Sequence, residues 1–325
     1  MAVPRRKFLR LALGAAAVPA MSPAAQGQAY PSRPVRLIVG IGPAGLSDLA
    51  ARLIGPWLSE RLGRQFVTEN RPGAGGNLAT EAVVRAAPDG YTLLLAQASD
   101  AINATLYEKL NFVFVRDITP VAGLIVVPNV LVLHPSVPAN TVPELIAYAK
   151  ANPGKLNMGS VGNGSVPHVA GELFKMMSDI NMVHVPYRGA APALTDLLAG
   201  QVHVFFGSPP STIEYIRAGR LRALAITTAM RSAALPGLPA LAEFVPGYET
   251  SFWAGIGAPK NTPAEVVDTL NKEINAGLAT PMIKAHLADL GGAEMPMTPS
   301  AFGKFITDET EKWGKVVKFA GIKVE

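Results

Sequence analysis

Short apolar runs alternate along this chain with longer segments in which apolar residues recur every three or four positions. The run 35–39 is continuous and β-branched and ends at Gly40, which is typical of a buried strand. The segment that follows has apolar residues at helical spacing. It predicts a helix whose apolar face is formed by Leu49, Leu53, Trp57, Leu58 and Leu62.

The same alternation continues through most of the chain. Further strands are predicted at Gln65–Glu69, Tyr91–Ala96, Val130–Leu133, Lys155–Met158, Met182–Val185, Val202–Phe206 and Ala223–Thr227. Further helices are predicted at Leu78–Ala86, Val142–Ala151, Val166–Ser178, Ala191–Ala199, Thr212–Ala218, Pro263–Leu278, Met282–Leu290 and Pro299–Phe319. This alternation is typical of an α/β fold whose sheets are mainly parallel and flanked by helices.

The N-terminal 29 residues have the pattern of an export signal. A basic start at 5–10 precedes the apolar run 11–20, and Gly27-Gln28-Ala29 offers a small-x-small cleavage site. The run is too short to span a bilayer comfortably. The Arg5-Arg6 pair followed by Phe8 favours the twin-arginine route, and an ordinary Sec signal with a chance arginine pair is the alternative. We therefore expect a periplasmic protein, cleaved near Ala29.

Removing that segment changes the charge and the length. It carries four basic residues and no acid, so 29 − 4 leaves 25 basic against 24 acidic residues, a net charge of +1. The excess of basic residues, which would be the main argument for nucleic acid as a partner, therefore lies in this segment and is absent from the mature chain. The remaining 325 − 29 = 296 residues suit two domains better than one core. The chain has no cysteine, which excludes disulfides and thiolate sites. We expect a soluble mature protein that is a monomer.

No linker rich in glycine and serine divides the chain, so two domains would be joined by ordered segments. Val126–Leu133 and Thr227–Phe252 are the candidate crossings. The second contains the proline- and glycine-rich piece 235–247, which favours an irregular connection there.

Three glycine-containing loops each join a predicted strand to a predicted helix. They are Gly40–Gly45, Gly159–His168 and Tyr187–Ala190, and the third contains the cation Arg188. Backbone N–H groups at a helix N-terminus attract anions, carboxylates included. Because these loops lie at the carboxyl ends of strands in two halves of the chain, they suggest a ligand held across a cleft.

The first loop also fits a dinucleotide-binding unit. Gly40–Gly45 reads G-x-G-x-x-G between a strand and a helix, and Glu69 closes the next strand 24 residues after Gly45. An exported flavin- or nicotinamide-dependent enzyme is therefore the alternative function. A tight turn whose glycines only permit close packing explains the same residues. The dinucleotide pattern covers only the first 50 or so mature residues.

Signatures of other enzymes are mostly absent. The sequence has no G-x-S-x-G elbow and no P-loop lysine, and its five histidines (134, 168, 184, 203 and 286) do not have the spacing of a zinc site. A cofactor-free hydrolase would need a nucleophile and a base that the sequence does not offer. Asp48 fits an N-cap better than a base. We expect no catalysis, no cofactor and no metal.

An ordered set of short motifs resembles the Bug-type receptors of tripartite tricarboxylate transporter systems. The motifs are Glu69–Gly76, Pro88–Leu94, Gly159–His168, Val185–Gly189, Pro192–Leu198, Ala218–Ala225, and Pro246–Glu249 with Trp253. They cover essentially the whole mature chain in the order of the family. The set therefore accounts for much more of the sequence than the dinucleotide pattern does.

The resemblance implies a periplasmic solute receptor with a two-lobed, type II-like binding-protein fold. Lobe 1 would comprise 30–128 and 251–325, and lobe 2 would comprise 129–250. A small organic carboxylate would be held in the cleft by closure of the lobes, and the partner would be a membrane permease or a sensor. The implied ligand-binding residues are Gly42, Ala44, Gly45, Leu46, Ser47, Gln97, Ala98, Ser160, Asn163, Ser165, His168, Arg188 and Gly207.

Several positions depart from the family pattern. Gly42 and Ala44 differ from the usual first turn, and His203 and Gly207 stand where many relatives have aspartates. The loss of acids near the second-lobe cleft bears on ligand choice, especially for ligands with an amino group. The sequence leaves mono-, di- and tricarboxylates, amino acids and aromatic acids open.

Overall fold

The computed structural model describes residues 30–231 and 235–324. The predicted export signal and its cleavage site near Ala29 lie outside the described residues. Within the described part of the chain, each helix is too short or too polar to cross a bilayer.

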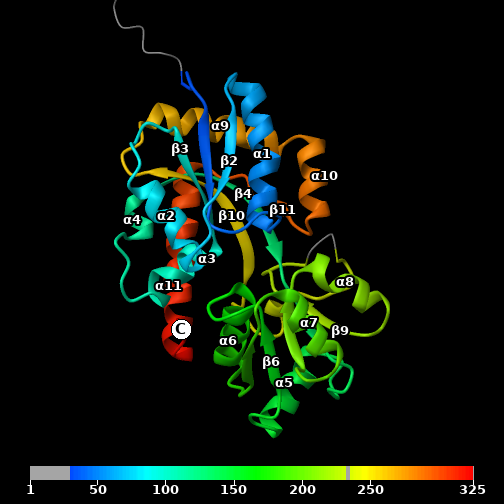
Figure 1. Ribbon diagram of the computed structural model, residues 1–325. Coiled ribbons are helices and arrows are strands. Elements are labelled where there is room, and N and C mark those ends of the chain that lie inside the picture. Colours follow the sequence, from blue (N-terminus) through cyan, green and yellow to red (C-terminus); the bar gives the residue numbers. More distant parts are fainter. Residues whose placement is uncertain (1–29, 232–234, 325) are drawn as a thin grey trace, which may run out of the picture.

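Two β-sheets form the frame of the molecule (Figure 1). The first sheet has the order β11-β4-β10-β3-β1-β2, and the second has the order β7-β6-β8-β5-β9. The first sheet contains β1 Val35–Val39, β2 Phe66–Asn70, β3 Thr92–Gln97, β4 Ile118–Pro128, β10 Ser251–Pro259 and β11 Ala293–Glu294. The second contains β5 Val130–Leu133, β6 Asn157–Ser160, β7 Val183–Pro186, β8 Val204–Gly207 and β9 Arg222–Ile226. We call each sheet with its flanking helices a lobe.

Both sheets are mixed. β1 runs parallel to β2 and β3, and β6 runs parallel to β7 and β8, as the sequence predicts. The strands that lead into or out of a crossing run antiparallel: β10 pairs with β3 and β4, and β5 pairs with β8 and β9. The two-lobed α/β fold is confirmed, with fewer parallel pairings than the strand–helix alternation suggested.

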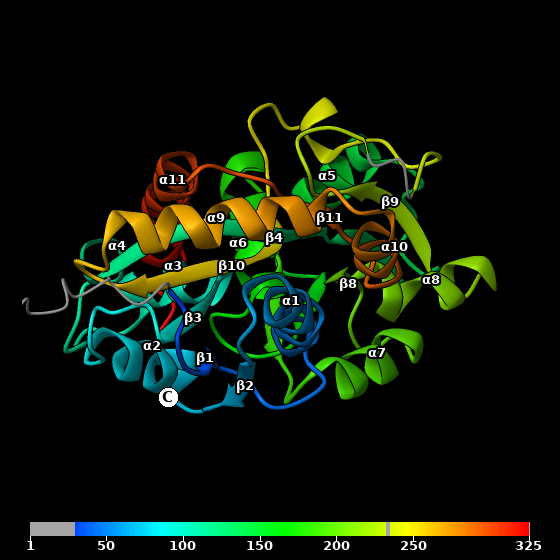
Figure 2. The same cartoon turned by 90° about the horizontal axis from the view of Figure 1, so that it is seen from above.

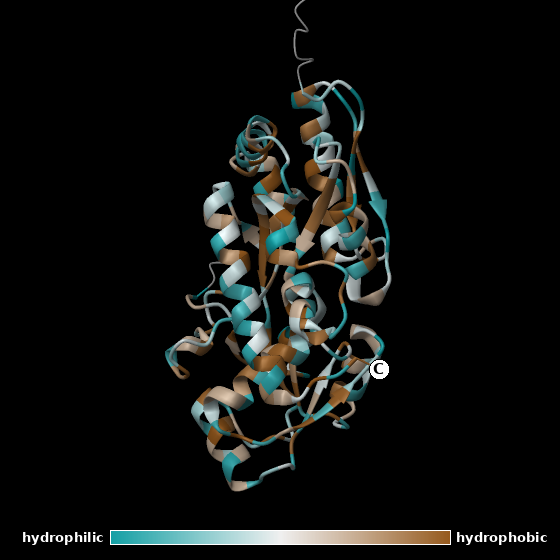
Figure 3. Ribbon diagram, turned by 90° about the vertical axis from the view of Figure 1, so that its left-hand side faces the viewer, coloured by the Kyte–Doolittle hydropathy of each residue, from teal (hydrophilic) through white to brown (hydrophobic). Residues whose placement is uncertain are grey.

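Helices cover both faces of each sheet. They are α1 Leu46–Leu62, α2 Asn77–Val84, α3 Ala98–Leu106, α4 Phe114–Asp117, α5 Val142–Ala151, α6 Val166–Ser178, α7 Ala190–Leu198, α8 Pro209–Arg217, α9 Ala264–Leu278, α10 Pro281–Asp289 and α11 Pro299–Ala320. One core joins α1, α9 and α10 to the first sheet, and Figure 2 shows α9 running along β4 and β10. A third core packs α7 and α8 on the second sheet. Figure 3 shows hydrophobic residues concentrated on the central strands.

The remaining core spans both lobes. It includes residues of α2, α3 and α11 on the first sheet and continues through α5 and α6 on the second. In Figure 1, α11 runs down the side of the first lobe, and its C-terminal end lies beside α6. The C-terminal helix thus packs against both lobes.

The buried face of α1 differs from the predicted one. Ala50, Ile54 and Leu58 are buried, whereas Leu49 is exposed and Leu53 is only half-buried. Small alanines at the contact let the helix lie close to the sheet. A prediction that considers only large apolar residues does not take these alanines into account. Leu58, which is also predicted on the apolar face, is buried as expected.

The chain passes between the sheets at Asn129 and again in the segment 227–250. Both passages fall within the predicted crossings. At the junction the Thr227 hydroxyl donates to the carbonyl of Thr250 at 2.7 Å, and the Asn129 N–H donates to that hydroxyl at 2.8 Å. Both threonines are fully buried. The two crossings are therefore bonded to each other.

A buried carboxylate ties α11 to the first sheet. Glu309 accepts the indole N–H of Trp253 on β10 at 2.9 Å and the indole N–H of Trp313 at 3.0 Å, and Lys312 pairs with it. Both tryptophans are fully buried. The acceptor therefore satisfies two donors that the core would otherwise leave without partners.

We predict that Glu309→Leu lowers the free energy of unfolding by about 2–4 kcal/mol, because two buried N–H donors lose their acceptor. The exposed pair formed by Lys304 and Asp308 on the same helix gives a control. Asp308→Ala is expected to change stability by less than about 0.5 kcal/mol. Urea unfolding of the three proteins tests this, and equal losses for the two variants would contradict it.

Candidate functional site

A cavity of about 330 Å³ lies between the two lobes. Ile41, Leu46, Gln97, Ser99 and Phe252 line it from the first lobe, and Asn129 lines it at the crossing. The second lobe contributes Val161, Ser165, Val166, Pro167, Ala190, Phe205, Ser208 and Ser211.

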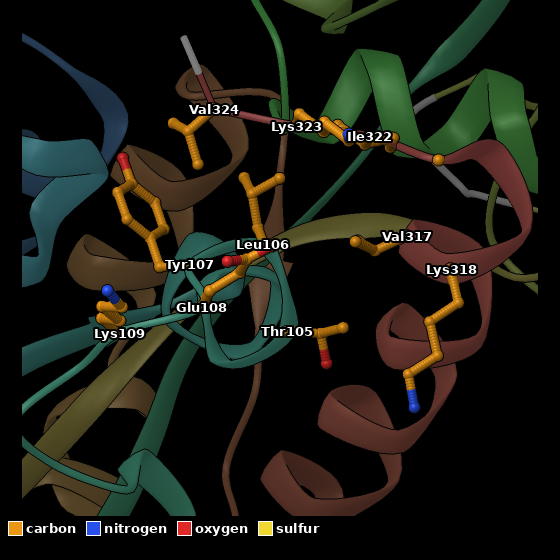
Figure 4. A pocket seen from close by; sticks show the side chains of 11 residues that line it. Thr105, Leu106, Tyr107, Glu108, Lys109, Val317, Lys318, Ile322, Lys323 and Val324 are labelled. Carbon is orange, nitrogen blue, oxygen red and sulfur yellow. The ribbon is translucent and has the colours of Figure 1, made fainter.

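A larger cavity of about 690 Å³ lies elsewhere, between the end of α3 and the end of α11 (Figure 4). Its walls include Tyr107, Lys109, Lys318 and Ile322, and it does not reach the second sheet. We assign the functional site to the smaller cavity, because helix starts of both lobes meet there.

Five helices begin at the interlobe cavity. Leu46 is the first residue of α1 and Ala190 the first of α7. The N-cap residues Gln97 of α3, Ser165 of α6 and Ser208 of α8 are lining residues as well. The first N–H groups of a helix have no partner within the helix, and the helix dipole places partial positive charge there. The first turns of α1, α3, α6 and α7 therefore contribute backbone N–H groups, whereas α8 begins with Pro209-Pro210, which have no N–H, and contributes the hydroxyl groups of Ser208 and Ser211.

The lining of this cavity carries no ionisable side chain. Within the described part of the chain, the lining residues include no lysine, arginine, histidine, aspartate or glutamate. Apolar side chains such as Leu46, Phe205 and Phe252 form much of the surface. The arrangement can hold an anion by backbone dipoles and hydroxyl groups while its apolar part packs on these side chains.

The first-lobe turn Gly40–Gly45 is stabilised by a hydrogen bond to Asp48. This buried carboxylate accepts the N–H of Ala44 at 2.9 Å and is bonded by Arg52 and Asn70. Burial opposes its ionisation, but the three hydrogen-bond donors together outweigh burial and lower the pKa of Asp48. Ala44 has φ +66°, a strained conformation for alanine that the surrounding bonds support. Asp48 thus stabilises the turn.

Gln97 and Asp100 form a capping box at the start of α3. The Gln97 side-chain oxygen accepts the Ser47 hydroxyl, which links α1 to α3. Asp100 accepts the Gln97 N–H at 2.8 Å and the Thr80 hydroxyl at 2.7 Å. Burial raises the pKa of Asp100 to about 6, although both hydrogen bonds act in the opposite direction.

The second-lobe loop is held by two histidines. Gly164 N–H donates to Nδ1 of His168 at 3.1 Å, and the Ser160 hydroxyl lies 2.6 Å from Nε2 of His184. The two rings stack with their centroids 3.6 Å apart. Ser165 donates its hydroxyl to the carbonyl of Gly162 and closes the loop at 2.7 Å.

The predicted ligand-binding residues divide into three groups by position. Leu46, Gln97 and Ser165 line the interlobe cavity. In the first lobe, Gly42, Ala44, Gly45, Ser47 and Ala98 lie in the same two helix starts without lining it. The second-lobe residues lie around the starts of α6, α7 and α8, also without lining the cavity, and they are Ser160, Asn163, His168, Arg188 and Gly207.

Four of these second-lobe residues have surroundings other than the interlobe cavity. Arg188 is exposed, and Gly207 is buried in β8, where a Cβ atom would meet the Thr212 side chain at 2.4 Å. Asn163 and His168 line a separate cavity of about 410 Å³ on the other side of their loop. Direct ligand contact by each of these residues stays a prediction.

Sequence reasoning missed most of the apolar wall and the serines of α8. That helix begins at Pro209, three residues before the predicted start, and Ser208 is its N-cap. A serine followed by prolines is a recognisable helix start, because proline fits the first helical turn. Ala190, Phe205 and Phe252 have no such signal, since they are ordinary apolar residues that the fold brings to the cavity.

Comparison with known proteins agrees with this geometry. The family model "Tripartite tricarboxylate transporter family receptor" matches residues 50–322. The chain is 36% identical to the protein BugT of Bordetella pertussis over 91% of this chain and 92% of that one. An R. palustris protein solved with adipate is 38% identical, with a TM-score of 0.77 over 90% of this chain and 99% of that one. MatC from Rhodopseudomonas palustris, solved with malate, is 30% identical, with a TM-score of 0.73 over 89% of this chain and 100% of that one.

The raised pKa of Asp100 predicts a pH dependence of stability. Its folded pKa of about 6 lies above its ordinary value of 3.8, so the folded state holds a proton that the unfolded state has lost between these values. The contribution of Asp100 to stability is therefore fully present below about pH 4 and is lost as the pH rises through about 6. Asparagine would mimic the protonated acid, accepting from Gln97 and donating to Thr80.

We predict that Asp100→Asn raises the free energy of unfolding by roughly 1–3 kcal/mol at pH 7.5 and changes it little at pH 4. The exposed Asp268→Asn is the control and is expected to shift stability by less than about 0.5 kcal/mol at both pH values. Urea unfolding at the two pH values measures both effects. A gain for Asp100→Asn that does not depend on pH would contradict the prediction.

Proposed function

The chain belongs to the tripartite tricarboxylate transporter receptor family, and on that premise we propose that its interlobe cavity captures a small organic carboxylate. Relatives of similar fold have been solved with adipate and with malate, both of which are carboxylates. Contacts from both lobes would favour the closed arrangement once the ligand is bound.

The convergence of five helix N-termini on a cavity without ionisable side chains carries this proposal. A carboxylate would gain from several dipoles at once and would meet no fixed negative charge on the wall. An ammonium group would meet several positive dipoles and no acidic partner. The site therefore favours acids without an amino group.

The volume and the apolar lining of the cavity also limit the size and chemistry of the ligand. Its volume of about 330 Å³ lies near the small end of ligand pockets, which span roughly 300–1,000 Å³. Ile41, Leu46, Phe205 and Phe252 would surround the part of the ligand that lies away from the carboxylate. We propose a mono- or dicarboxylate with an apolar aliphatic or aromatic centre.

The glycines of the first turn support the receptor over the dinucleotide-binding alternative. A Cβ atom on Gly40 would come within 2.9 Å of Cα of Gly76, and one on Gly45 within 2.3 Å of the Ile41 side chain. Close packing on the Gly76 backbone therefore requires glycine at position 40 without any pyrophosphate, whereas the end of the Ile41 side chain can move away from a Cβ atom at position 45. The cavity beside this turn is also small for a dinucleotide.

We further propose that the protein acts in the periplasm after removal of its N-terminal signal near Ala29, and that it catalyses no reaction. It would work as a monomer and deliver its ligand to a membrane permease or present it to a sensor. The pattern of the N-terminal sequence and the membership of a receptor family support this part of the proposal.

Calorimetry with matched acids and amides tests the proposal. We expect adipate or hexanoate to bind, and adipamide and hexanamide to bind at least ten-fold more weakly, because the amides lack the charge that the helix dipoles stabilise. Native mass spectrometry of gently purified mature protein would identify a ligand retained from the cell. A bound flavin, or equal affinity for acids and amides, would overturn the proposal.

A carboxylate placed on the cavity wall gives a second prediction. Val166 is the first residue of α6 and lines the cavity, and aspartate suits the first turn of a helix. We predict that Val166→Asp weakens carboxylate binding at least ten-fold by charge repulsion. The fold is expected to persist, which thermal unfolding of the ligand-free protein checks.

Ala264→Asp is the matched control, because Ala264 is the exposed first residue of α9, outside the cavity. It is expected to leave the affinity within about two-fold of that of the unchanged protein. Unaltered affinity in Val166→Asp, or an equal loss in the control, would count against an anion site at the start of α6.

A further inference from the structure

The stacked pair His168 and His184 lies behind the second-lobe loop, on the side away from the ligand cavity. Both rings line the separate cavity of about 410 Å³, together with Glu172, Lys175 and residues 320–323. His168 comes from the first turn of α6, and His184 comes from β7. Their ring planes are inclined by only 7°. This pair is not part of the cavity wall that would contact a ligand.

Each ring is bonded to the backbone loop that leads into α6. His168 accepts the Gly164 N–H directly. His184 acts through the Ser160 hydroxyl, which bonds with both the carbonyl and the N–H of Gly162 at 3.2 Å. The pair thus fixes two glycines of one short loop from one side.

The other side of the same loop faces the ligand cavity. Val161 lines it, as do the three residues Ser165–Pro167 at the start of α6. Gly162 and Gly164 adopt φ values of +129° and +73°, which leave the loop shape dependent on its hydrogen bonds. The direction of the first N–H groups of α6 follows from that shape.

Gly164 is also a contact point between the lobes. A Cβ atom at this position would lie 2.2 Å from a methyl carbon of Leu106 at the end of α3. The loop at Gly164 therefore packs against the end of α3 in the first lobe. A small change in the loop would alter both the α6 N-terminus and this contact.

The environment keeps both rings neutral, as the bond to Gly164 requires. Burial, the neighbouring ring and Lys175 lower the pKa of His168 to about 3, and burial and Lys175 lower the pKa of His184 to about 4. Glu172 lies 3.8 Å from Nε2 of His168, but its carboxylate pairs with Lys175 at 2.9 Å. A neutral ring can accept the Gly164 N–H, and a protonated ring cannot.

We propose that His168 and His184 are positioning residues of the carboxylate site, which hold the loop 160–165 so that the start of α6 presents its N–H groups to the ligand. This inference rests on the proposed function. It gives His168 a role behind the loop, in place of the direct ligand contact that the sequence suggested.

Two substitutions at position 168 separate the acceptor from the rest of the side chain. His168→Asn keeps an oxygen acceptor close to the position of Nδ1, whereas His168→Leu offers none. Both variants lose the stacked ring, so the difference between them isolates the bond to Gly164. We expect His168→Leu to bind hexanoate or adipate at least ten-fold more weakly, and His168→Asn to stay within about three-fold of the unchanged protein.

His203 provides the matched control, because the structure places it at the end of β6 remote from the ligand cavity, and the position near the second-lobe cleft expected from the sequence is wrong. Nδ1 of His203 accepts the backbone N–H of Asn157 at 2.9 Å, which is the same kind of bond at the opposite end of β6. His203→Leu is expected to lower stability and to leave the affinity for these acids within about two-fold. Calorimetry of the three variants overturns the proposal if His168→Leu binds as the unchanged protein does, or if His203→Leu loses affinity equally.

A second measurement needs no ligand. Amide hydrogen exchange of the ligand-free protein, followed by NMR, should show the Gly164 N–H exchanging at least ten-fold faster in His168→Leu than in His168→Asn. If the unchanged protein binds no carboxylate, the proposed function fails, and this exchange rate still decides the positioning role. Equal protection of Gly164 in both variants would overturn that role.

Discussion

The junction at Thr227 is the constraint on which the site depends. Its hydroxyl and backbone bond to both crossings, with Asn129 on the outward passage and Thr250 on the return. Because the two passages are bonded side by side, the sheets meet where β4 and β9 end and where β5 and β10 begin. The carboxyl ends of the parallel strands β3, β6 and β8 lead into helices that start at the interlobe cavity. The cavity is a consequence of how the lobes are joined.

This origin explains why helix starts, rather than charged side chains, provide the polar groups of the wall. A lysine or arginine in so small a cavity would have to be desolvated together with the ligand, at a large cost in free energy unless the pair is well bonded. Helix N-termini are already oriented by the fold and need no rearrangement when an anion arrives. The cation Arg188, which the sequence singled out, is exposed and lies beyond the cavity wall.

The sequence predicted the features that have a local cause. Strands such as β5, the loops Gly40–Gly45 and Gly159–His168, and the two crossings all carry their signals within a few residues. β10 was missed because its glycines weaken the strand pattern: Gly255 makes room for Phe302, and Gly257 makes room for Ile118. Such packing depends on partners far away in the chain, and so does the position of Phe252 at the cavity. A single sequence does not reveal either.

The same hydrogen-bond arrangement recurs at three of the helix starts. Asp48, Asp100 and His168 each occupy the third position of their helix and reach back to accept a backbone N–H of the preceding turn. That bond removes a donor that precedes the helix and leaves the first N–H groups of the helix itself for a ligand.

The acceptors differ in charge between the lobes. Carboxylates serve as acceptors in the first lobe, where Asp48 is paired with Arg52, and a neutral imidazole serves in the second, where the neighbouring Glu172 is paired with Lys175. A bound anion would draw the two lobes together when the cleft closes, and the contact between Gly164 and Leu106 lies between them.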